Sequence, residues 1–109
     1  MPSLPQAQQR VLETPFGPIV GATYRRDGGQ YCALHTSRGV VGCGIFDLAC
    51  ADAFSMAFAI CRGTPEHPLR EPEDIYAAKV TAVSAAAAKM GISTGMTGLE
   101  AVEKMVNSV

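Results

Sequence analysis

Apolar and polar residues alternate in short runs along the first half of the chain, and turn residues separate the runs. This pattern is typical of β-strands. Segments 19–25 and 30–36 are rich in β-branched and aromatic residues, and Asp27-Gly-Gly29 between them favours a tight hairpin. A shorter strand is expected at 11–14 and a further long strand at 40–46. Tight turns between consecutive strands predict an antiparallel β-meander.

The second half of the chain changes to a helical pattern. Asp47 is expected to cap a helix over 48–61, a segment that is apolar on nearly every side, as a helix buried all round would be. A second helix is predicted at 79–90, where Gly91 suits the left-handed backbone of a helix end. A last helix is predicted at 98–107.

Strands come first and helices second, so the predicted fold class is α+β. We expect an N-terminal antiparallel meander followed by helices packed on it, one apolar central helix and two C-terminal helices, in a single domain. Residues 1–10 are predicted to be loose, 11–46 to form the β-rich region and 47–109 the helical region. The proline-containing stretch 62–72 predicts an exposed loop, and 73–77 a single helical turn.

The apolar content is high for so small a protein. Of the 109 residues, 48% are hydrophobic and 17% are charged, whereas about 25% are charged in an ordinary soluble domain. A chain of this length buries only roughly 65% of its unfolded surface. We therefore expect self-association through the N-terminal sheet. Either the C-terminal helices or a second copy would cover the outer side of the 48–61 segment.

Charge and hydropathy exclude several classes of partner. The net charge is −1 and the longest basic run is Arg25-Arg26, which argues against nucleic-acid binding. The N-terminus has no apolar run of the kind found in secretory signals. The longest apolar stretch, 48–61, is too short to span a bilayer. We expect a soluble cytoplasmic protein without a membrane or nucleic-acid partner.

The four cysteines are expected to be reduced thiols, because no export signal accompanies them. Ten, six and ten residues separate them in turn, spacings that do not match a zinc site. We therefore predict no metal and no cofactor, and interpret Cys32, Cys50 and Cys61 as small buried hydrophobic residues.

Three separated blocks of residues occur in order along the chain: Gly39-x-x-x-Cys-Gly-x-x-Asp47, Pro72-Glu-Asp-Ile-Tyr-x-Ala-Lys-Val80 and Gly91-Ile-x-x-Gly-Met-Thr-Gly-x-Glu-Ala101. In these blocks the chain resembles the YunC-like proteins, domain-of-unknown-function family 1805, over about residues 14–105. The resemblance implies an N-terminal β-region that mediates tetramerisation and no established biochemical activity. The chain departs from the family's pattern in the 62–72 loop, so no partner contact is carried over there.

Cys43 is the strongest candidate for chemistry. Gly42 and Gly44 remove side-chain bulk beside it, so a ligand or another backbone could approach its sulfur closely. A nucleophilic or redox thiol also needs a stabilised thiolate, which the start of the 48–61 helix or His35 could supply. The alternative is a cysteine packed in a sheet, with glycines that allow close contact between sheets or subunits.

The contribution of His35 depends on the strand register. With a turn at 38–39, His35 lies on the opposite face of the sheet from Cys43. With a turn at 37–39, His35 becomes a diagonal neighbour of Cys43 on the same face. The sequence leaves both registers open.

The glycine-rich segment 91–98 raises a further possibility. Exposed N–H groups of Gly95, Thr97 and Gly98 at a helix start could bind a small anion. However, the nucleotide-binding fingerprints are absent from this segment. The same residues also suit a helix end, a tight turn and a capping box from Thr97 to Glu100.

Two aspartates have simpler explanations than catalysis. Asp47 could act as a general base, although capping of the 48–61 helix accounts for it. Asp52 lies in an otherwise apolar segment, so we expect an ion pair with Arg25, Arg62 or a partner subunit.

The sequence thus favours a homo-oligomer, a tetramer joined through its N-terminal sheet, with no assigned reaction. The alternative is a thiol-dependent enzyme or redox protein that uses Cys43, aided by His35. A weaker alternative is a protein that holds a small anion at 95–98. The identity of any small-molecule ligand stays open, and the candidate ligand-binding residues are Gly42, Gly44, Asp47, Gly95, Thr97 and Gly98.

Overall fold

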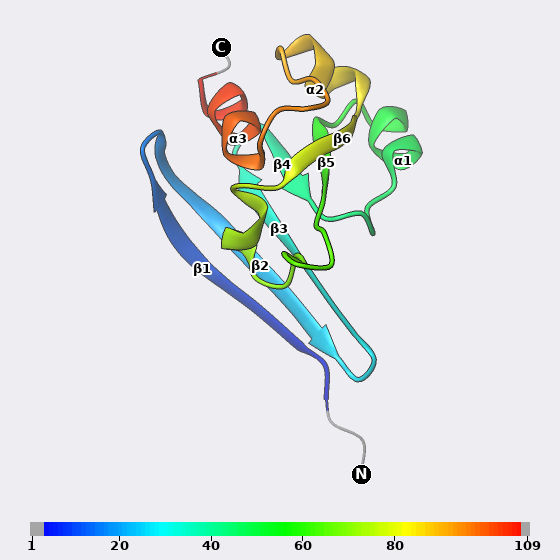
Figure 1. Cartoon of the computed structure of the whole chain (residues 1–109). Coiled ribbons are helices and arrows are strands. Elements are labelled where there is room, and N and C mark those ends of the chain that lie inside the picture. The colour runs from blue at the N-terminus through cyan, green and yellow to red at the C-terminus, as the bar shows by residue number, and fades with distance from the viewer. Residues whose placement is uncertain (1–3, 108–109) are drawn as a thin grey trace.

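A computed structural model describes residues 4–107 of the chain. Within this range six strands form one sheet in the order β1-β2-β3-β4-β5-β6, and helices pack against it (Figure 1). The strands are β1 (Gln6–Thr14), β2 (Gly17–Arg26), β3 (Gly29–Thr36), β4 (Gly39–Gly42), β5 (Phe58–Arg62) and β6 (Lys79–Val83). The helices are α1 (Leu48–Ala53), the 3-10 helix η1 (Pro72–Ile75), α2 (Ala85–Lys89) and α3 (Gly98–Val106).

The arrangement confirms the predicted α+β class. Neighbouring strands are antiparallel except for β4 and β5, which are parallel and connected through α1. Over residues 4–107, every helix is too short or too polar to cross a bilayer.

The first three strands form a long antiparallel ribbon, called the ribbon (β1–β3) below. Its second hairpin turns at Asp27-Gly28, as predicted, and Gly28 has a φ of +85°, a conformation that favours glycine. The expectation of a loose 1–10 segment is wrong for residues 6–10, which pair with β2. Residues 1–3 lie outside the described range. The start of β1 is polar and lacks the apolar alternation of a typical strand. It is a strand because its backbone pairs with β2.

The predicted helix over 48–61 is wrong beyond residue 53. Asp47 caps α1 as expected and accepts a hydrogen bond from the Ala49 N–H at 3.0 Å. Ser55 then takes a left-handed backbone with a φ of +55°, and the apolar residues after it form β5. A strand in the interior of a sheet has the same continuous apolar run as a buried helix, so hydrophobicity alone does not separate the two.

The strand predicted at 40–46 is shorter than expected, since β4 ends at Gly42. The helix predicted at 79–90 is wrong over 79–83, which form β6 against β5. Val80, Thr81 and Val83 are β-branched and favour a strand there.

Two short helices follow β6. Ser84 caps α2, and its hydroxyl oxygen accepts from the Ala87 N–H at 3.3 Å. Gly91 has a φ of +92° after the end of α2, which confirms the predicted helix end. α3 begins and ends close to the predicted bounds, with the predicted capping box between Thr97 and Glu100.

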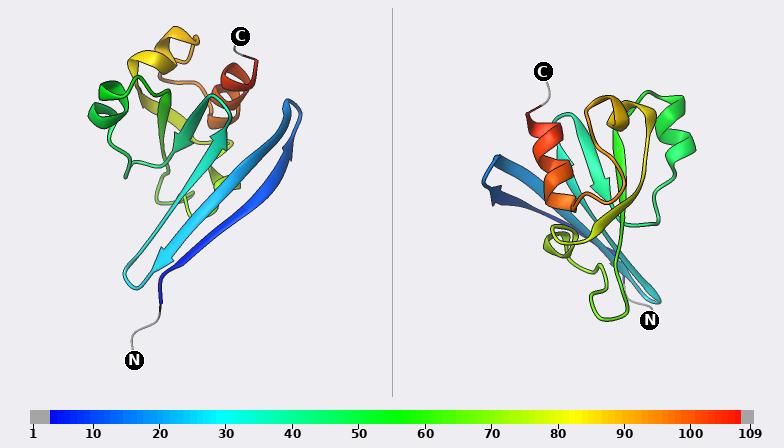
Figure 2. Two further views of the ribbon diagram at one scale, coloured as in Figure 1. Left: turned by 180° about the vertical axis from the view of Figure 1, so that it is seen from behind. Right: turned by 45° about the horizontal axis from the view of Figure 1, so that its top comes forward.

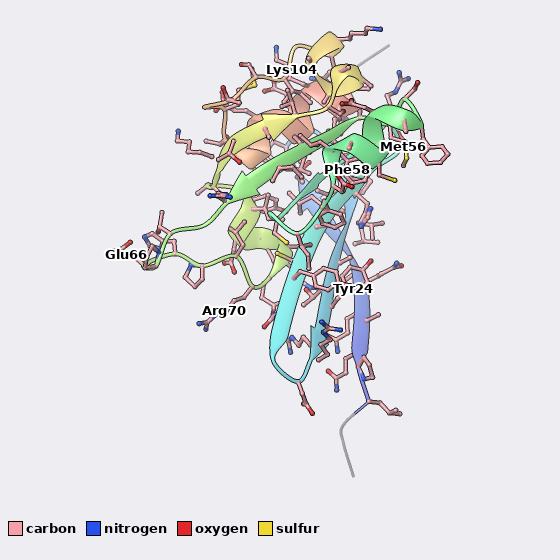
Figure 3. The ribbon with its side chains drawn as sticks, turned by 90° about the vertical axis from the view of Figure 1, so that its right-hand side faces the viewer. Tyr24, Met56, Phe58, Glu66, Arg70 and Lys104 are labelled. Carbon is pink, nitrogen blue, oxygen red and sulfur yellow. The ribbon has the colours of Figure 1, made fainter. Side chains whose placement is uncertain are left out.

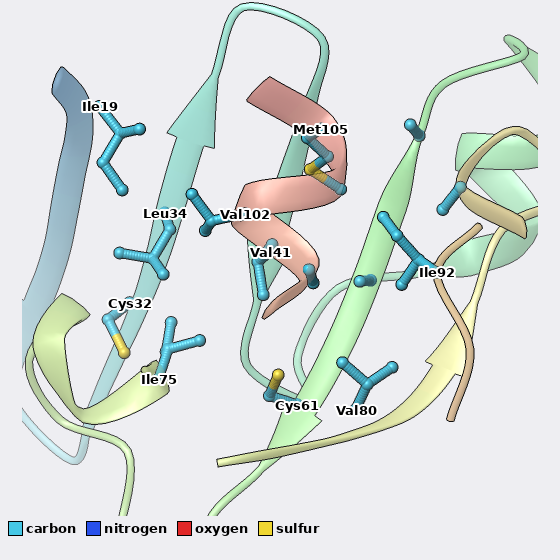
Figure 4. Packing of buried hydrophobic residues seen from close by; sticks show 14 of the residues in the cluster. Ile19, Cys32, Leu34, Val41, Cys61, Ile75, Val80, Ile92, Val102 and Met105 are labelled. Carbon is cyan, nitrogen blue, oxygen red and sulfur yellow. The ribbon is translucent and has the colours of Figure 1, made fainter. Parts of the chain in front are cut away.

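The C-terminal elements all cover one side of the sheet, which we call the covered face. η1, α2 and α3 each contact its strands on this side. Val102 and Met105 of α3 pack with Leu34 and Val41 of the sheet, and all four residues are 0% exposed (Figure 4). This cluster is the hydrophobic core.

The opposite side of the sheet, which we call the open face, carries a different set of side chains. Register and strand alternation assign to it Val11, Val20, Tyr24, Tyr31, His35, Val40 and Phe58. Seen from behind, β2 and β3 have no helix in front of them within the described range (Figure 2, left). In Figure 3, Tyr24 and Phe58 lie on one side of the molecule and the loop with Glu66 projects from the other.

Candidate functional site

Cys43 lies directly after β4, and 9% of the residue is exposed. Its backbone N–H donates to the carbonyl of Cys32 at 3.3 Å, and its own carbonyl accepts from the Phe46 N–H at 3.4 Å. The β4–β5 register places Cys61 at the same level on the next strand. Because strand residues alternate between faces, these three cysteines form a row across β3, β4 and β5 on the covered face.

In two members of this row, Cys32 and Cys61, burial disfavours the thiolate, which is the reactive form of the thiol. Burial raises the pKa of Cys32 to about 12, with a smaller contribution from the neighbouring Cys43. Burial also raises the pKa of Cys61 to about 12. Both thiols therefore stay protonated at neutral pH, as expected of packed hydrophobic residues. The same expectation is wrong for Cys50, which is exposed because the outer side of α1 faces solvent.

His35 does not approach Cys43, and neither predicted register is correct. The β3–β4 turn is Ser37-Arg38, so Thr36 pairs with Gly39 and His35 with Val40. His35 is thereby on the open face, whereas the row of cysteines is on the covered face. The Thr36 hydroxyl oxygen selects this turn, because it accepts from the Arg38 N–H at 3.2 Å and from the Gly39 N–H at 3.0 Å.

The imidazole of His35 has an apolar environment. Its Nε2 atom is buried and has no hydrogen-bond partner among the described residues. Burial lowers the pKa of His35, so the ring is neutral at pH 7. A cavity of about 420 Å³ beside it is bounded in part by Val11, Val20 and Val106. No described side chain is therefore placed to exchange a proton with this ring nitrogen.

The two glycines around Cys43 have different roles. A Cβ atom built on Gly42 would lie 2.3 Å from the ring of Phe46, so this glycine makes room for an aromatic side chain of the same chain. Gly44 is exposed, and a Cβ there would meet open space. The space left by the missing side chain of Gly42 is therefore filled by Phe46 on the open face, whereas the Cys43 side chain points to the covered face.

Asp47 and Asp52 each accept a hydrogen bond from a backbone N–H group at the start of a helix. Asp47 caps α1, in agreement with the simpler of its two interpretations. Asp52 pairs with neither Arg25 nor Arg62 in the described residues, and its carboxylate instead accepts a hydrogen bond from the Ala85 N–H at 2.8 Å, at the start of α2. An ion pair with a partner subunit stays a prediction. Two ion pairs, Arg10–Glu73 and Arg25–Glu71, occur in the part of the chain that the structure describes.

The 95–98 segment has little to offer an anion. The Gly95 N–H donates to the Val80 carbonyl, and the Gly98 N–H to the Ala78 carbonyl, each at 2.9 Å. The Thr97 N–H donates to the Glu100 carboxylate at 3.0 Å. An anion bound there would have to displace these bonds, so the structural explanation accounts for the segment.

A second cavity, of about 610 Å³, was not foreseen from the sequence. It lies between the end of β5, the 62–72 loop, η1 and the start of β6, and it is lined by Arg62, Arg70 and Lys79 among others. The available signal was the density of charged residues around the prolines of this loop, which the sequence alone assigns to an exposed surface. The described residues contain no group of three or more His, Cys, Asp or Glu side chains able to hold a metal ion.

Comparisons with known proteins place the fold but not an activity. A family model described as "Domain of unknown function (DUF1805)" matches residues 42–105. A crystal structure of a protein of unknown function from Thermoplasma acidophilum is similar with a TM-score of 0.80 and 18% sequence identity, covering 93% of this chain and 94% of that one. No curated protein matches the chain. At this identity the structural likeness shows the fold alone.

Proposed function

The chain belongs to the DUF1805 family of domains of unknown function, as the sequence blocks predicted, and from this premise we propose that it acts as a cytoplasmic homotetramer. The subunits join through the open face of the N-terminal sheet. The observation that carries this proposal is an apolar sheet face without a helix over β2 and β3 in the described range.

The open face has the composition of a protein interface. Val11 is 66% exposed on the edge strand. Tyr24 and Tyr31 stack with ring centroids 4.8 Å apart, and Phe46 contacts Tyr31 edge-on at 6.4 Å. Aromatic residues, tyrosine above all, are enriched in interfaces because they bury a large area with few rotatable bonds.

A second copy of the chain is the occupant that the charges favour. On the open side of the ribbon, register places Glu13 near one end and Arg26 near the other, with apolar and neutral residues between them. Two ribbons packed face to face and antiparallel about a two-fold axis would bring each Glu13 towards the partner's Arg26. Such an axis makes the contact self-complementary, as in most closed homodimers.

A tetramer needs one further contact. Ile45, Phe54 and Met56 lie around α1 and are 62%, 72% and 46% exposed. Apolar side chains of this size at the surface suit the second interface of a dimer of dimers. A cytoplasmic location belongs to the same proposal, since all four cysteines are free thiols.

Light scattering on the full chain tests the proposal. We expect the mass of a tetramer at micromolar concentration, and a stable monomer would overturn the proposal. Val11→Lys places a charge on the open face and should dissociate the assembly. Gln8→Lys is the matched control, because Gln8 lies on the same strand but pairs with Thr23 on the covered side.

The two variants separate the open face from the strand edge. A tetramer that survives Val11→Lys would exclude the open face as the interface. Equal dissociation by both lysines would place the contact along the edge of β1. The melting of each variant by circular dichroism, measured in parallel, shows that the subunit remains folded.

A further inference from the structure

We propose that the cavity between the 62–72 loop, η1 and β6 binds a small molecule through a multivalent oxyanion, either a phosphate or a group of carboxylates. Its volume of about 610 Å³ lies within the range of small-molecule sites. The proposal does not depend on the oligomeric state.

The acidic residues of η1 are already engaged. Glu73 pairs with Arg10 of β1. Asp74 accepts the N–H groups of Arg70 at 3.1 Å and Glu71 at 2.9 Å. The carboxylates of η1 are therefore committed to the ribbon or to the backbone of the loop, and among residues 4–107 the cationic groups of the cavity form no ion pair.

The cationic groups face one another across two strands. Arg62 and Lys79 are register partners at the end of the β5–β6 pair, and both line the cavity. Directly opposed like charges destabilise a sheet. Neither residue forms an ion pair within the range that the structure describes. A bound oxyanion would remove this repulsion, which is the physical reason to expect one.

The other nearby carboxylates form no ion pair with Arg62 or Lys79 in the described range, including Glu66, which lines the cavity on the projecting part of the loop. The carboxylate of Glu100 acts on Lys79 through space, but it is held at the start of α3 by the Thr97 N–H. Arg70 adds a third cation to the cavity lining. Guanidinium groups bind phosphate and carboxylate through two parallel hydrogen bonds, which suits a multivalent oxyanion.

The cavity is built from an ordered loop. Thr64 and His67 exchange backbone hydrogen bonds of 3.1 and 3.0 Å, which close a tight turn. The Arg70 carbonyl accepts from the side-chain amide of Gln30 on β3 at 2.8 Å, which ties the loop to the ribbon. Figure 3 shows Glu66 on the projecting part of this loop and Arg70 closer to the strands.

The remaining lining suits the organic part of a ligand. Pro68, Ala77 and Ala78 present small apolar surfaces within the same cavity. The volume exceeds what an inorganic ion would fill. The ligand class is therefore a small organic molecule with one strongly anionic end.

Calorimetric titration of the full chain with inorganic pyrophosphate, and separately with citrate, tests the proposal at low salt. We expect saturable binding and amide shifts in NMR spectra at residues 62–79. Arg62→Gln and Lys79→Gln should each weaken binding by about tenfold or more, the usual effect of losing a hydrogen bond to a charged group. Both side chains are exposed, so the variants should fold.

Arg38→Gln and Lys89→Gln are matched controls, because they remove the same charge from exposed positions outside the cavity. Each control should change affinity by less than about twofold, within the range of a screened surface charge. Binding of pyrophosphate alone supports a phosphate ligand, and binding of citrate alone supports a carboxylate ligand. No saturable binding of either anion, or equal weakening by the controls, would overturn the proposal.

Discussion

The two faces of one sheet are both apolar, yet only one of them is a core. On the covered face, Leu34 and Val41 are 0% exposed beneath α3. On the open face, Val11 is 66% exposed and the tyrosines of β2 and β3 are half-buried. Strands with apolar residues on both sides are typical of sheets that are covered twice. The chain supplies one cover itself and, under our proposal, takes the other from a second copy.

The largest expected difference is between the rates at which iodoacetamide alkylates the buried and the exposed cysteines. Burial raises the pKa of Cys32 and Cys61 to about 12, so almost none of either thiol is in the reactive thiolate form at neutral pH. The exposed Cys50 should be labelled first, as peptide mapping by mass spectrometry would show. Labelling of Cys43 faster than Cys50 would support the alternative that the protein is a thiol-dependent enzyme that uses Cys43.

The next contrast is in stability, measured by urea unfolding of the monomeric Val11→Lys variant. In this background Leu34→Ala should lower the free energy of unfolding by about 2–5 kcal/mol, because it leaves a cavity in the core. Val20→Ala on the open face should cost about 1 kcal/mol or less, since the monomer leaves this side chain half-buried. Equal losses would mean that the open face is already packed within the subunit.

A smaller effect on stability is expected from the cap at the start of α3, the helix that packs on the core. Thr97→Ala removes the hydroxyl that accepts the Glu100 N–H at 3.1 Å. The loss should lower the free energy of unfolding by about 0.5–2 kcal/mol. Thr94→Ala, at an exposed loop position, is the control and should change it by less than about 0.5 kcal/mol. A control loss as large as that of Thr97→Ala would argue against the cap.

The smallest effect concerns the ion pair that ties η1 to the ribbon. The hydrogen bond from Arg10 lowers the pKa of Glu73 below its ordinary 4.5. The pair therefore stabilises the folded state above that value, and its contribution is lost as pH falls through the lowered pKa of the folded state. Both side chains are nearly half exposed, so solvent screens the pair and the effect is small.

Thermal unfolding across pH measures this contribution. The parent should have a slightly higher Tm than Glu73→Gln at neutral pH, and the difference should vanish in acid. Glu66→Gln is the control, because Glu66 has no ion pair in the described part of the chain. A Glu73→Gln difference that persists in acid would show that the carboxylate's charge is not its source.

Local chemistry determined the parts of the fold that the sequence predicted well. Gly91 adopts the left-handed backbone expected of it, Asp27-Gly28 closes the predicted hairpin, and Asp47 and Thr97 cap the helices that follow. Each of these features depends on neighbours within a few residues. The family blocks are local patterns too, which is why membership could be predicted without a structure.

Segments that depend on distant contacts were predicted poorly. Residues 58–62 and 79–83 are strands because each finds the other across the sheet. Their apolar and alanine-rich surroundings suit a helix equally well. The β3–β4 register followed from the Thr36 hydroxyl, a contact that neither predicted turn used. That register separated His35 from Cys43 and removed the catalytic pair that the sequence allowed.

By itself, the sequence determined the α+β class, the hairpin, the helix caps and a surplus of apolar residues, because short-range propensities and composition are sufficient for these. The tertiary structure decided which face each side chain occupies and brought Arg62 and Lys79 together beneath a charged loop. A register shift of one residue reverses every face of a strand. Pairing between distant segments therefore decides which apolar residues are exposed and which cationic side chains lie close together.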